Sequence, residues 1–334
     1  MCNAVDSRVP LQNIIIIHNF LAKSKYLHKK TQKALLDNLS FACYNKNSIS
    51  IITEVTDMKH TIGFAYSQQL GTVAEVFSLY RQCGLESTFT SVGSREELCE
   101  WANLAVKNGL LYSSLHAPFK KAAKMWDESL EGEDAEQELS DCIRACAELG
   151  VPILVVHPFI GFYPHEPTAI GAARYTRLAE QAASCGIKIA LENVEGEAEL
   201  ACLMDTLRDF DSVGFCLDTG HELCYNRGKD MLSLYGDRLI YTHINSNIGV
   251  TDPNGVITYL DDSHMLPFDG LADMAGLAHR LQAHGYTGDL MMELSKGNHR
   301  DRHTNDRYEA MTVEEYVAEA AARIKRLRDL VDNA

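Results

Sequence analysis

The chain has 334 residues, of which 46% are hydrophobic and 23% are charged, and its formal net charge is -15. This composition is typical of a globular protein, and no apolar run of about 18 residues is present, so we expect no membrane span. An acidic protein repels a polyanion such as DNA unless its basic residues cluster locally, so we do not expect a nucleic acid as its partner.

The first 57 residues differ from the rest of the chain. They hold seven Lys and Arg against four acidic residues, a net charge of +3, which leaves -18 for residues 58–334. Met58 opens the stretch MKHTIGFAY, which resembles the N-terminus of a protein. The apolar run at 14–20 is too short for a signal peptide. We therefore predict an N-terminal extension over residues 1–57, either disordered or an upstream start that the native protein does not use, and one domain over residues 58–334.

Ten cysteines are scattered along the chain, and no CxxC motif occurs. Several of them lie among apolar residues, where cysteine behaves as a small hydrophobic side chain. This pattern favours reduced thiols over a disulfide framework, so we expect a cytoplasmic protein.

From Met58 onward, short apolar runs alternate with helical patterns. Most of the runs are continuously apolar, which is typical of parallel strands covered on both faces. The predicted strands cover residues 61–66, 85–90, 110–116, 151–157, 187–193, 213–218, 239–245 and 289–295.

Helix signals fill the gaps between these runs. The sequences SREE at 94–97 and TVEE at 312–315 are capping boxes, which start helices. Amphipathic segments cover residues 133–149, 168–185 and 271–284, and a glycine follows each of them. Strands and helices in strict alternation, eight of each, predict an α/β fold: a (β/α)8 TIM barrel that forms a single domain behind the N-terminal extension.

A doubly wound open sheet is the alternative fold. Such a sheet often has a glycine-rich phosphate loop after its first strand. Here that junction reads AYSQQLGTVAEV and contains no GxGxxG motif, which favours the barrel.

Ionisable side chains end six consecutive predicted strands. Each one alone has a structural explanation, as a hydrogen-bonded core histidine or a helix cap. A barrel, however, gathers its strand ends into one ring, and buried carboxylates are rarely unpaired. The residues are His116, His157, Glu192 with the adjacent Asn193, Asp218 with His221 in the following turn, His243 and Glu293, and Asp262 and His264 lie in the loop after the seventh strand. This oxygen-rich set predicts one divalent metal ion, Mn²⁺, Mg²⁺ or Co²⁺, with Zn²⁺ also compatible.

On the motifs EN (192–193), DTGH (218–221), HIN (243–245) and the glutamate of the last strand, residues 58–334 resemble the xylose isomerase-like barrels. This superfamily includes sugar-phosphate isomerases and epimerases, ketose 3-epimerases and endonuclease IV-type enzymes. The resemblance implies that Glu192, Asp218, His243 and Glu293 bind the metal. It also implies that the two glutamates move protons and that His221 contacts substrate.

These features favour a metal-dependent isomerase or epimerase that acts on a sugar or a sugar phosphate. It would transfer a proton next to a carbonyl through an enediolate, with Glu192 and Glu293 on opposite sides of the substrate carbon. Epimerisation, isomerisation and dehydration of a keto-polyol all remain open at this point. We expect His116, His157, His264 and Asn193 to line the site for a small sugar or polyol. Such barrels often pair, so a homo-oligomer is compatible with the resemblance.

The alternative function is a trinuclear zinc phosphodiesterase of the endonuclease IV type, which acts on abasic DNA. Its additional ligands would be His116, His157, His221, Asp262 and His264. The charge of the domain argues against a DNA substrate. Ser246 also follows the HIN motif, where the nuclease pattern usually has Asp. A sugar-binding protein without catalytic activity is a third hypothesis.

Overall fold

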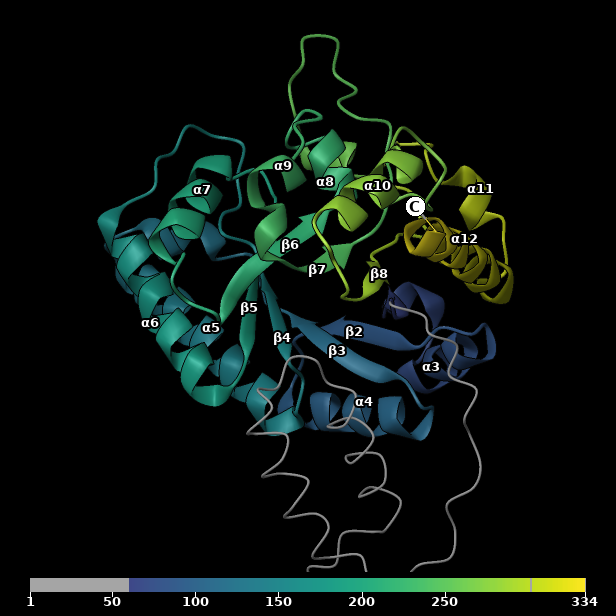
Figure 1. Ribbon diagram of the computed structural model, residues 1–334, viewed down its shortest axis with the longest axis horizontal. Helices are drawn as coiled ribbons and strands as arrows, with labels where there is room; N and C mark the ends of the chain where they lie inside the picture. The colour runs from purple at the N-terminus through teal and green to yellow at the C-terminus, as the bar shows by residue number, and fades with distance from the viewer. Residues whose placement is uncertain (1–59, 301, 334) are drawn as a thin grey trace, which may run out of the picture. The chain divides into compact units, whose positions relative to one another are not determined.

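The structure is a computed structural model that describes residues 60–300 and 302–333 (Figure 1). The predicted extension over residues 1–57 lies outside the described residues. One strand coincides with each of the eight predicted runs, and only β2 extends past its run, by one residue. The strands are β1 (Ile62–Ala65), β2 (Ser87–Ser91), β3 (Leu111–His116), β4 (Ile153–Val156), β5 (Lys188–Glu192), β6 (Val213–Asp218), β7 (Leu239–His243) and β8 (Leu290–Met292).

These strands form one parallel sheet in the order β7-β6-β5-β4-β3-β2-β1-β8. The sheet closes between its two end strands, where Ile244, just past β7, bridges Met292 in parallel. The amide of Ile244 donates a hydrogen bond of 2.7 Å to the carbonyl of Met291. The predicted (β/α)8 barrel is therefore confirmed, and the open doubly wound sheet is excluded.

Helices surround the barrel (Figure 1). The α-helices are α3 (Val73–Gln82), α4 (Arg95–Lys107), α5 (Leu130–Leu149), α6 (Ala169–Cys185), α7 (Glu197–Thr206), α8 (Thr219–Leu223), α9 (Leu232–Tyr235), α10 (Met274–Ala283), α11 (Asp306–Glu309) and α12 (Val313–Asn333). Short 3-10 segments are η1 (Gln68–Leu70), η2 (Ala122–Trp126), η3 (Gly236–Arg238) and η4 (Tyr259–Asp261). The alternation is not strict, because two short helices, α8 and α9, stand between β6 and β7 in place of one.

The helix boundaries follow local hydrogen bonding. Ser94 and Glu97 form the predicted capping box of α4, and Gly150 ends α5 in the left-handed conformation with a φ of 70°. The prediction that α5 begins near residue 133 was wrong by three residues. Ser129 caps the helix earlier, because its side chain accepts a hydrogen bond from the amide of Gly132 at 3.2 Å.

Burial of the strands explains their continuous apolar character. All four residues of β4 and all six residues of β6 are buried, as expected for a sheet covered on both faces. The eight cysteines within the described residues are free thiols. Among the described helices, none combines the length and the apolar character that crossing a membrane requires.

Candidate functional site

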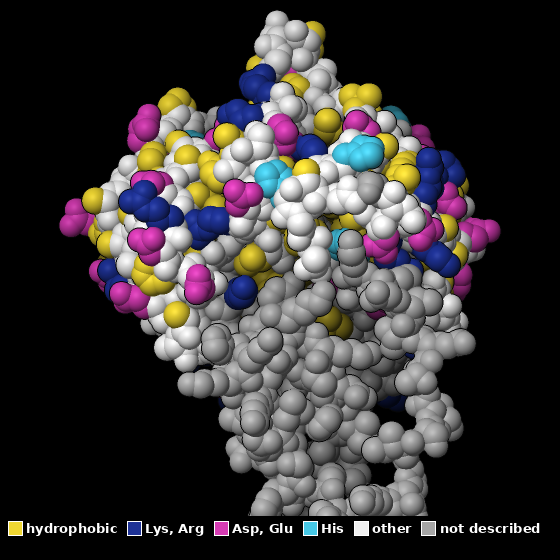
Figure 2. Space-filling model, viewed as in Figure 1, with side chains coloured by type: hydrophobic (Ala, Val, Ile, Leu, Met, Phe, Trp, Pro, Cys, Tyr) yellow, Lys and Arg dark blue, Asp and Glu magenta, His cyan; other side chains and the backbone are white. Residues whose placement is uncertain are grey.

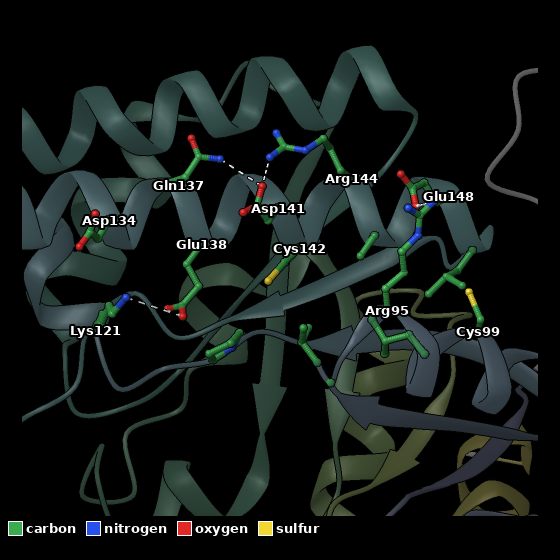
Figure 3. A pocket seen from close by; sticks show the side chains of 16 residues that line it. Arg95, Cys99, Lys121, Asp134, Gln137, Glu138, Asp141, Cys142, Arg144 and Glu148 are labelled. Carbon is green, nitrogen blue, oxygen red and sulfur yellow. Dashed lines mark hydrogen bonds and ion pairs between the residues drawn. The ribbon is translucent and has the colours of Figure 1, made fainter.

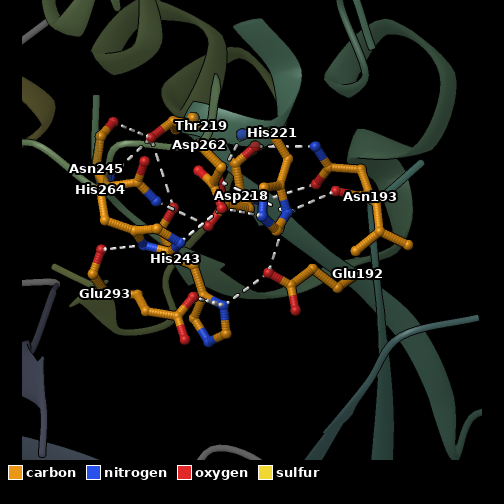
Figure 4. A network of polar contacts seen from close by, with 12 residues as sticks. Glu192, Asn193, Asp218, Thr219, His221, His243, Asn245, Asp262, His264 and Glu293 are labelled. Carbon is orange, nitrogen blue, oxygen red and sulfur yellow. Dashed lines mark hydrogen bonds and ion pairs between the residues drawn. The ribbon is translucent and has the colours of Figure 1, made fainter. Parts of the chain in front are cut away.

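The carboxyl ends of the last four strands converge on one buried cluster (Figure 4). Glu192, Asp218 and His243 are the final residues of β5, β6 and β7, and Glu293 directly follows β8. The potential ligand atoms of these four residues all lie within 4.8 Å of one another. His243 Nδ1 is 2.9 Å from Glu192 Oε1 and 3.2 Å from Glu293 Oε2. The structure thus brings together the four residues that the sequence singles out as metal ligands.

Glu192 lies at the centre of this cluster, and its two oxygens face different partners. Oε1 faces His243 and, at 3.6 Å, His221 Nδ1. Oε2 lies 3.3 Å from His116 Nε2 and 3.1 Å from His157 Nε2. Each carboxylate oxygen of Glu192 therefore has imidazole nitrogens beside it.

A second group lies beside the first. Asp262 Oδ2 is 3.0 Å from His221 Nε2 and 2.7 Å from His264 Nε2. His264 has a φ of 45°, in the left-handed region that non-glycine residues seldom adopt. Its Nδ1 lies 3.0 Å from the carbonyl of Glu293, which ties this group to the end of β8. Asp262 and His264 therefore contact both the DTGH turn and the end of β8, beyond their own loop.

The DTGH turn combines a helix cap with a candidate ligand. Asp218 Oδ1 accepts the amide of His221 at 2.7 Å and so caps α8, as the structural explanation of this motif expected. Its other oxygen accepts Asn245 Nδ2 at 2.8 Å. Gly220 is required by this packing, since an added Cβ would lie 1.9 Å from Asn245 Oδ1. Asp218 is therefore both the N-cap of α8 and a candidate metal ligand.

Asn193 is also expected to contact substrate, but both polar atoms of its side chain are already hydrogen-bonded within the protein. Its side-chain amide is engaged with the backbone of Asp218 and with Asn226. Thr219 and Asn245 also hold the turn, because the hydroxyl of Thr219 accepts the amide of Asn245 and donates to its carbonyl. Sequence reasoning missed the roles of Thr219, Asn226 and Asn245, although Asn245 belongs to the HIN motif.

Burial and charge oppose each other within the cluster. Burial disfavours the ionised form of Glu192, but the neighbouring His243 and His157 outweigh it and hold the pKa of Glu192 well below its ordinary value. Burial likewise lowers the pKa of His243, yet Glu192 and Glu293 raise it well above the ordinary value. Burial also raises the pKa of Asp218 to about 6. Within residues 60–300 and 302–333, no Lys or Arg forms an ion pair with the cluster carboxylates, so histidines balance their charge.

The donor set fits a divalent cation. Three polar atoms of the cluster are buried and have no hydrogen-bond partner among the described residues: His157 Nδ1, His243 Nε2 and Asp262 Oδ1. Leaving a buried polar group unsatisfied costs about 1–3 kcal/mol. A cation would neutralise the crowded carboxylates and displace protons from the imidazoles, since metal ligands bind in their deprotonated forms. Carboxylate oxygen with imidazole nitrogen suits Mn²⁺, Co²⁺ or Zn²⁺.

A separate cavity of about 820 Å³ lies on the outside of the barrel, between α4 and α5 (Figure 3). Charged pairs cross it or lie at its edge, including Arg95 with Glu148 and Lys121 with Glu138. None of its lining residues belongs to the cluster, so the chemistry expected from the strand ends does not involve this cavity.

Comparison with known proteins agrees with this arrangement. The model of the family described as xylose isomerase-like TIM barrel matches residues 64–327. A structure of a xylose isomerase domain protein from Planctomyces limnophilus covers 84% of this chain and 100% of that chain, with a TM-score of 0.63 and 16% identity. D-allulose 3-epimerase from Methylomonas sp. covers 80% of this chain and 98% of that chain, with a TM-score of 0.60 and 18% identity.

A further structure and one curated relative are also similar to this chain. The 3-keto-D-glucoside 4-epimerase YcjR from E. coli covers 80% of this chain and 99% of that chain, with a TM-score of 0.59 and 18% identity. The uncharacterised protein y4fM of Sinorhizobium fredii is 31% identical over 154 residues, which are 44% of this chain and 43% of that protein. The match thus spans less than half of that relative. The barrel and the family match over residues 64–327 lead to one conclusion: the chain belongs to the xylose isomerase-like TIM barrel family.

Proposed function

We propose that this protein is a metal-dependent sugar isomerase or epimerase that transfers a proton next to a carbonyl group. The observation that carries the proposal is the convergence of Glu192, Asp218, His243 and Glu293 within 4.8 Å at the carboxyl end of the barrel. Two glutamates beside a candidate metal site provide both the acid and the base that such a reaction needs. Structurally similar proteins include D-allulose 3-epimerase and L-ribulose 3-epimerase, whose substrates are sugars of this class.

The two glutamates differ in their access to solvent. Glu293 has 25% of its side chain exposed, whereas Glu192 is fully buried and contacts four histidines. A divalent metal in the cluster would supply Lewis acidity, which stabilises negative charge on the oxygen of a carbonyl. Glu293 would remove or return the proton on the exposed side of the substrate carbon, and Glu192 would act from the other side. His221 and His264 would hold hydroxyl groups of the sugar.

Proton exchange with solvent tests this proposal. The full chain, loaded with Mn²⁺, would be incubated in D₂O with D-allulose, D-fructose, their phosphates and inososes. Deuterium at the carbon next to the carbonyl would be measured by mass spectrometry. We expect exchange with the native chain and its loss in Glu293→Gln, while Glu128→Gln, an exposed carboxylate on the outer surface, exchanges like the native chain. Full exchange in Glu293→Gln would remove the role given to this residue.

A second candidate function is favoured by one specific observation. The candidate ligands extend beyond a single metal site, because His116 and His157 approach Glu192 while His221, Asp262 and His264 form their own group. Three groups linked in this way are the set expected of a trinuclear zinc phosphodiesterase that acts on abasic DNA. The surface weighs against DNA. On the described part of the face in Figure 2, Lys and Arg are interspersed with Asp and Glu and do not gather in one basic patch.

Metal analysis separates the two candidates. The isomerase or epimerase requires one tightly bound divalent ion per chain, whereas the phosphodiesterase requires about three zinc ions. About three zinc ions, together with cleavage of an oligonucleotide that contains an abasic site, would establish the second candidate in place of the first.

A further inference from the structure

Aromatic side chains continue outward from the histidines of the cluster. The ring of Phe119 stacks on His157, with 4.7 Å between centroids and an interplanar angle of 16°. The ring of Tyr225 stacks on His221, also at 4.7 Å. Phe162 in turn contacts Tyr225 edge-on at 5.6 Å. We call Phe119, Phe162 and Tyr225 the aromatic rim.

The rim forms one continuous chain of ring contacts with the cluster. His157 and His221, on which Phe119 and Tyr225 stack, are themselves 6.2 Å apart in an edge-on arrangement. The three aromatic residues come from the loops after β3, β4 and β6, which leave the barrel at the end where the cluster lies. A molecule that reaches the cluster beside His157 would therefore meet the rim.

The loop that presents Phe162 is held on both sides. The amide of Gly161 donates to Glu195 Oε1 at 3.0 Å, and His165 Nδ1 lies 2.5 Å from the buried Glu199. Gly161 has a φ of 138°, and an added Cβ would lie 2.4 Å from the ring of Tyr163. These contacts fix the conformation of the turn, and the turn holds Phe162 in its exposed position.

Two rings of the rim are open to solvent, and two residues of the cluster are also accessible. Phe119 is 41% exposed and Phe162 is 46% exposed. The side chains of Glu293 and His264 are 25% and 19% exposed. An uncovered aromatic ring exposes apolar area to water, and a second ring that stacks on it removes that area from water. Phe119 combines an exposed ring with a direct stacking contact to His157 of the cluster, and sites that hold an apolar group beside a polar one combine such features.

We propose that the natural substrate is a sugar derivative that carries an apolar or aromatic substituent, with this substituent against Phe119 and Phe162. The inference rests on the proposed function, because it assigns the polar part of the ligand to the metal cluster. The rim then determines specificity: it favours a substituted sugar over the corresponding sugar without a ring to stack.

Paired ligands test the inference by calorimetry. The full chain loaded with Mn²⁺ would be titrated with methyl and para-nitrophenyl 3-keto-glycosides of the same hexose, for several hexoses, because these glycosides keep a carbonyl beside a hydroxyl group for the metal cluster to bind. We expect the para-nitrophenyl member of a pair to bind about three- to tenfold more tightly, which corresponds to one aromatic contact. Phe162→Ala should reduce this preference to about twofold or less, and Phe162→Tyr should retain it.

Tyr163→Ala is the matched control. Tyr163 lies in the same loop and is 55% exposed, but its ring contacts among the described residues are with Phe159 and His165 and not with the rim. This variant should keep the preference of the native chain.

The outcomes separate the inference from the function on which it rests. Equal affinity for both members of every pair would overturn the inference and leave the proposed function standing. Loss of the preference in Tyr163→Ala as well as in Phe162→Ala would also overturn it, because the loop and not the ring would then be responsible. No binding of any glycoside or ketose by the metal-loaded chain would overturn both the inference and the proposed function. Tight binding of an abasic oligonucleotide in their place would do the same and favour the phosphodiesterase.

Discussion

Asn193 clamps the backbone of Asp218 from both sides. Its Nδ2 donates to the Asp218 carbonyl at 2.9 Å, and its Oδ1 accepts the Asp218 amide at 2.7 Å. Both residues are fully buried. This pair of hydrogen bonds fixes the end of β6 against the end of β5, and it thereby sets the position of one candidate ligand relative to Glu192.

Replacing Asn193 by Ala should weaken metal binding and destabilise the fold. Removal of the side chain leaves a buried amide and a buried carbonyl of Asp218 unsatisfied, at about 1–3 kcal/mol each. Loss of a group that orients a metal ligand typically lowers metal affinity about 10- to 100-fold. Urea unfolding and Mn²⁺ titration would measure the two effects. Asn254→Ala, on an exposed turn, should change neither, and native Mn²⁺ affinity in Asn193→Ala would contradict the positioning role.

Gly220→Ala should disrupt the same turn by steric conflict. The new Cβ would fall 1.9 Å from Asn245 Oδ1, so Asn245 must move, and its hydrogen bond to Asp218 Oδ2 is then lost. We expect weaker Mn²⁺ binding and a lower midpoint of thermal unfolding. Gly297→Ala is the matched control, because its nearest neighbours would lie at ordinary contact distances of 3.6 Å or more. A Gly220→Ala variant with native metal affinity would show that the turn tolerates a side chain.

Much of the barrel and of the cluster could be predicted from the sequence, for an identifiable reason. Continuous apolar runs identify buried parallel strands, and the barrel places the ends of all such strands on one side, so Glu192, His243 and Glu293 could be grouped without coordinates. The start of α5 was misplaced because Ser129 caps it through a single local hydrogen bond.

Other features depend on contacts between distant segments and leave no local signal. The clamp between Asn193 and Asp218 joins residues 25 positions apart. The approach of His116 and His157 to one oxygen of Glu192, and of Phe162 to Tyr225, likewise depends on loops that meet only after the barrel has closed. Sequence periodicity describes the elements themselves, whereas the direction of a side chain within a loop is set by such tertiary hydrogen bonds and ring contacts.

Metal removal should lower the stability of the native chain. The cluster places Glu192, Asp218 and Glu293 close together, and within the described part of the chain only histidines balance their charge when no cation is bound. A ligand that binds only the folded state stabilises it by about 2.7 kcal/mol at a concentration 100-fold above Kd. We expect a chelator to lower the unfolding temperature and Mn²⁺ to restore it. Glu192→Gln should show no such response, while Glu128→Gln should respond like the native chain; an unchanged response in Glu192→Gln would argue against this site.

Asp289 should make stability depend on pH. Burial raises its pKa from 3.8 to about 7, although hydrogen bonds from Ser113 and Thr61 oppose the shift. The folded protein therefore holds this proton more tightly than the unfolded chain, so the contribution to stability is present at low pH. It is lost at about 1.4 kcal/mol per pH unit as the pH rises between these two pKa values, and it stays constant above them. Asp289→Asn cannot ionise, so its free energy of unfolding should rise relative to the native chain between pH values of about 5 and 8.

Urea unfolding of both chains at the two pH values would measure that difference. The exposed Asp209 offers a matched control, because Asp209→Asn should follow the native chain at both pH values. A constant difference between Asp289→Asn and the native chain would mean that the Asp289 carboxyl titrates alike in the folded and unfolded states. The test is independent of the metal, because Ser113, Thr61 and Glu86, the groups that act on the pKa of Asp289 besides burial, lie outside the cluster.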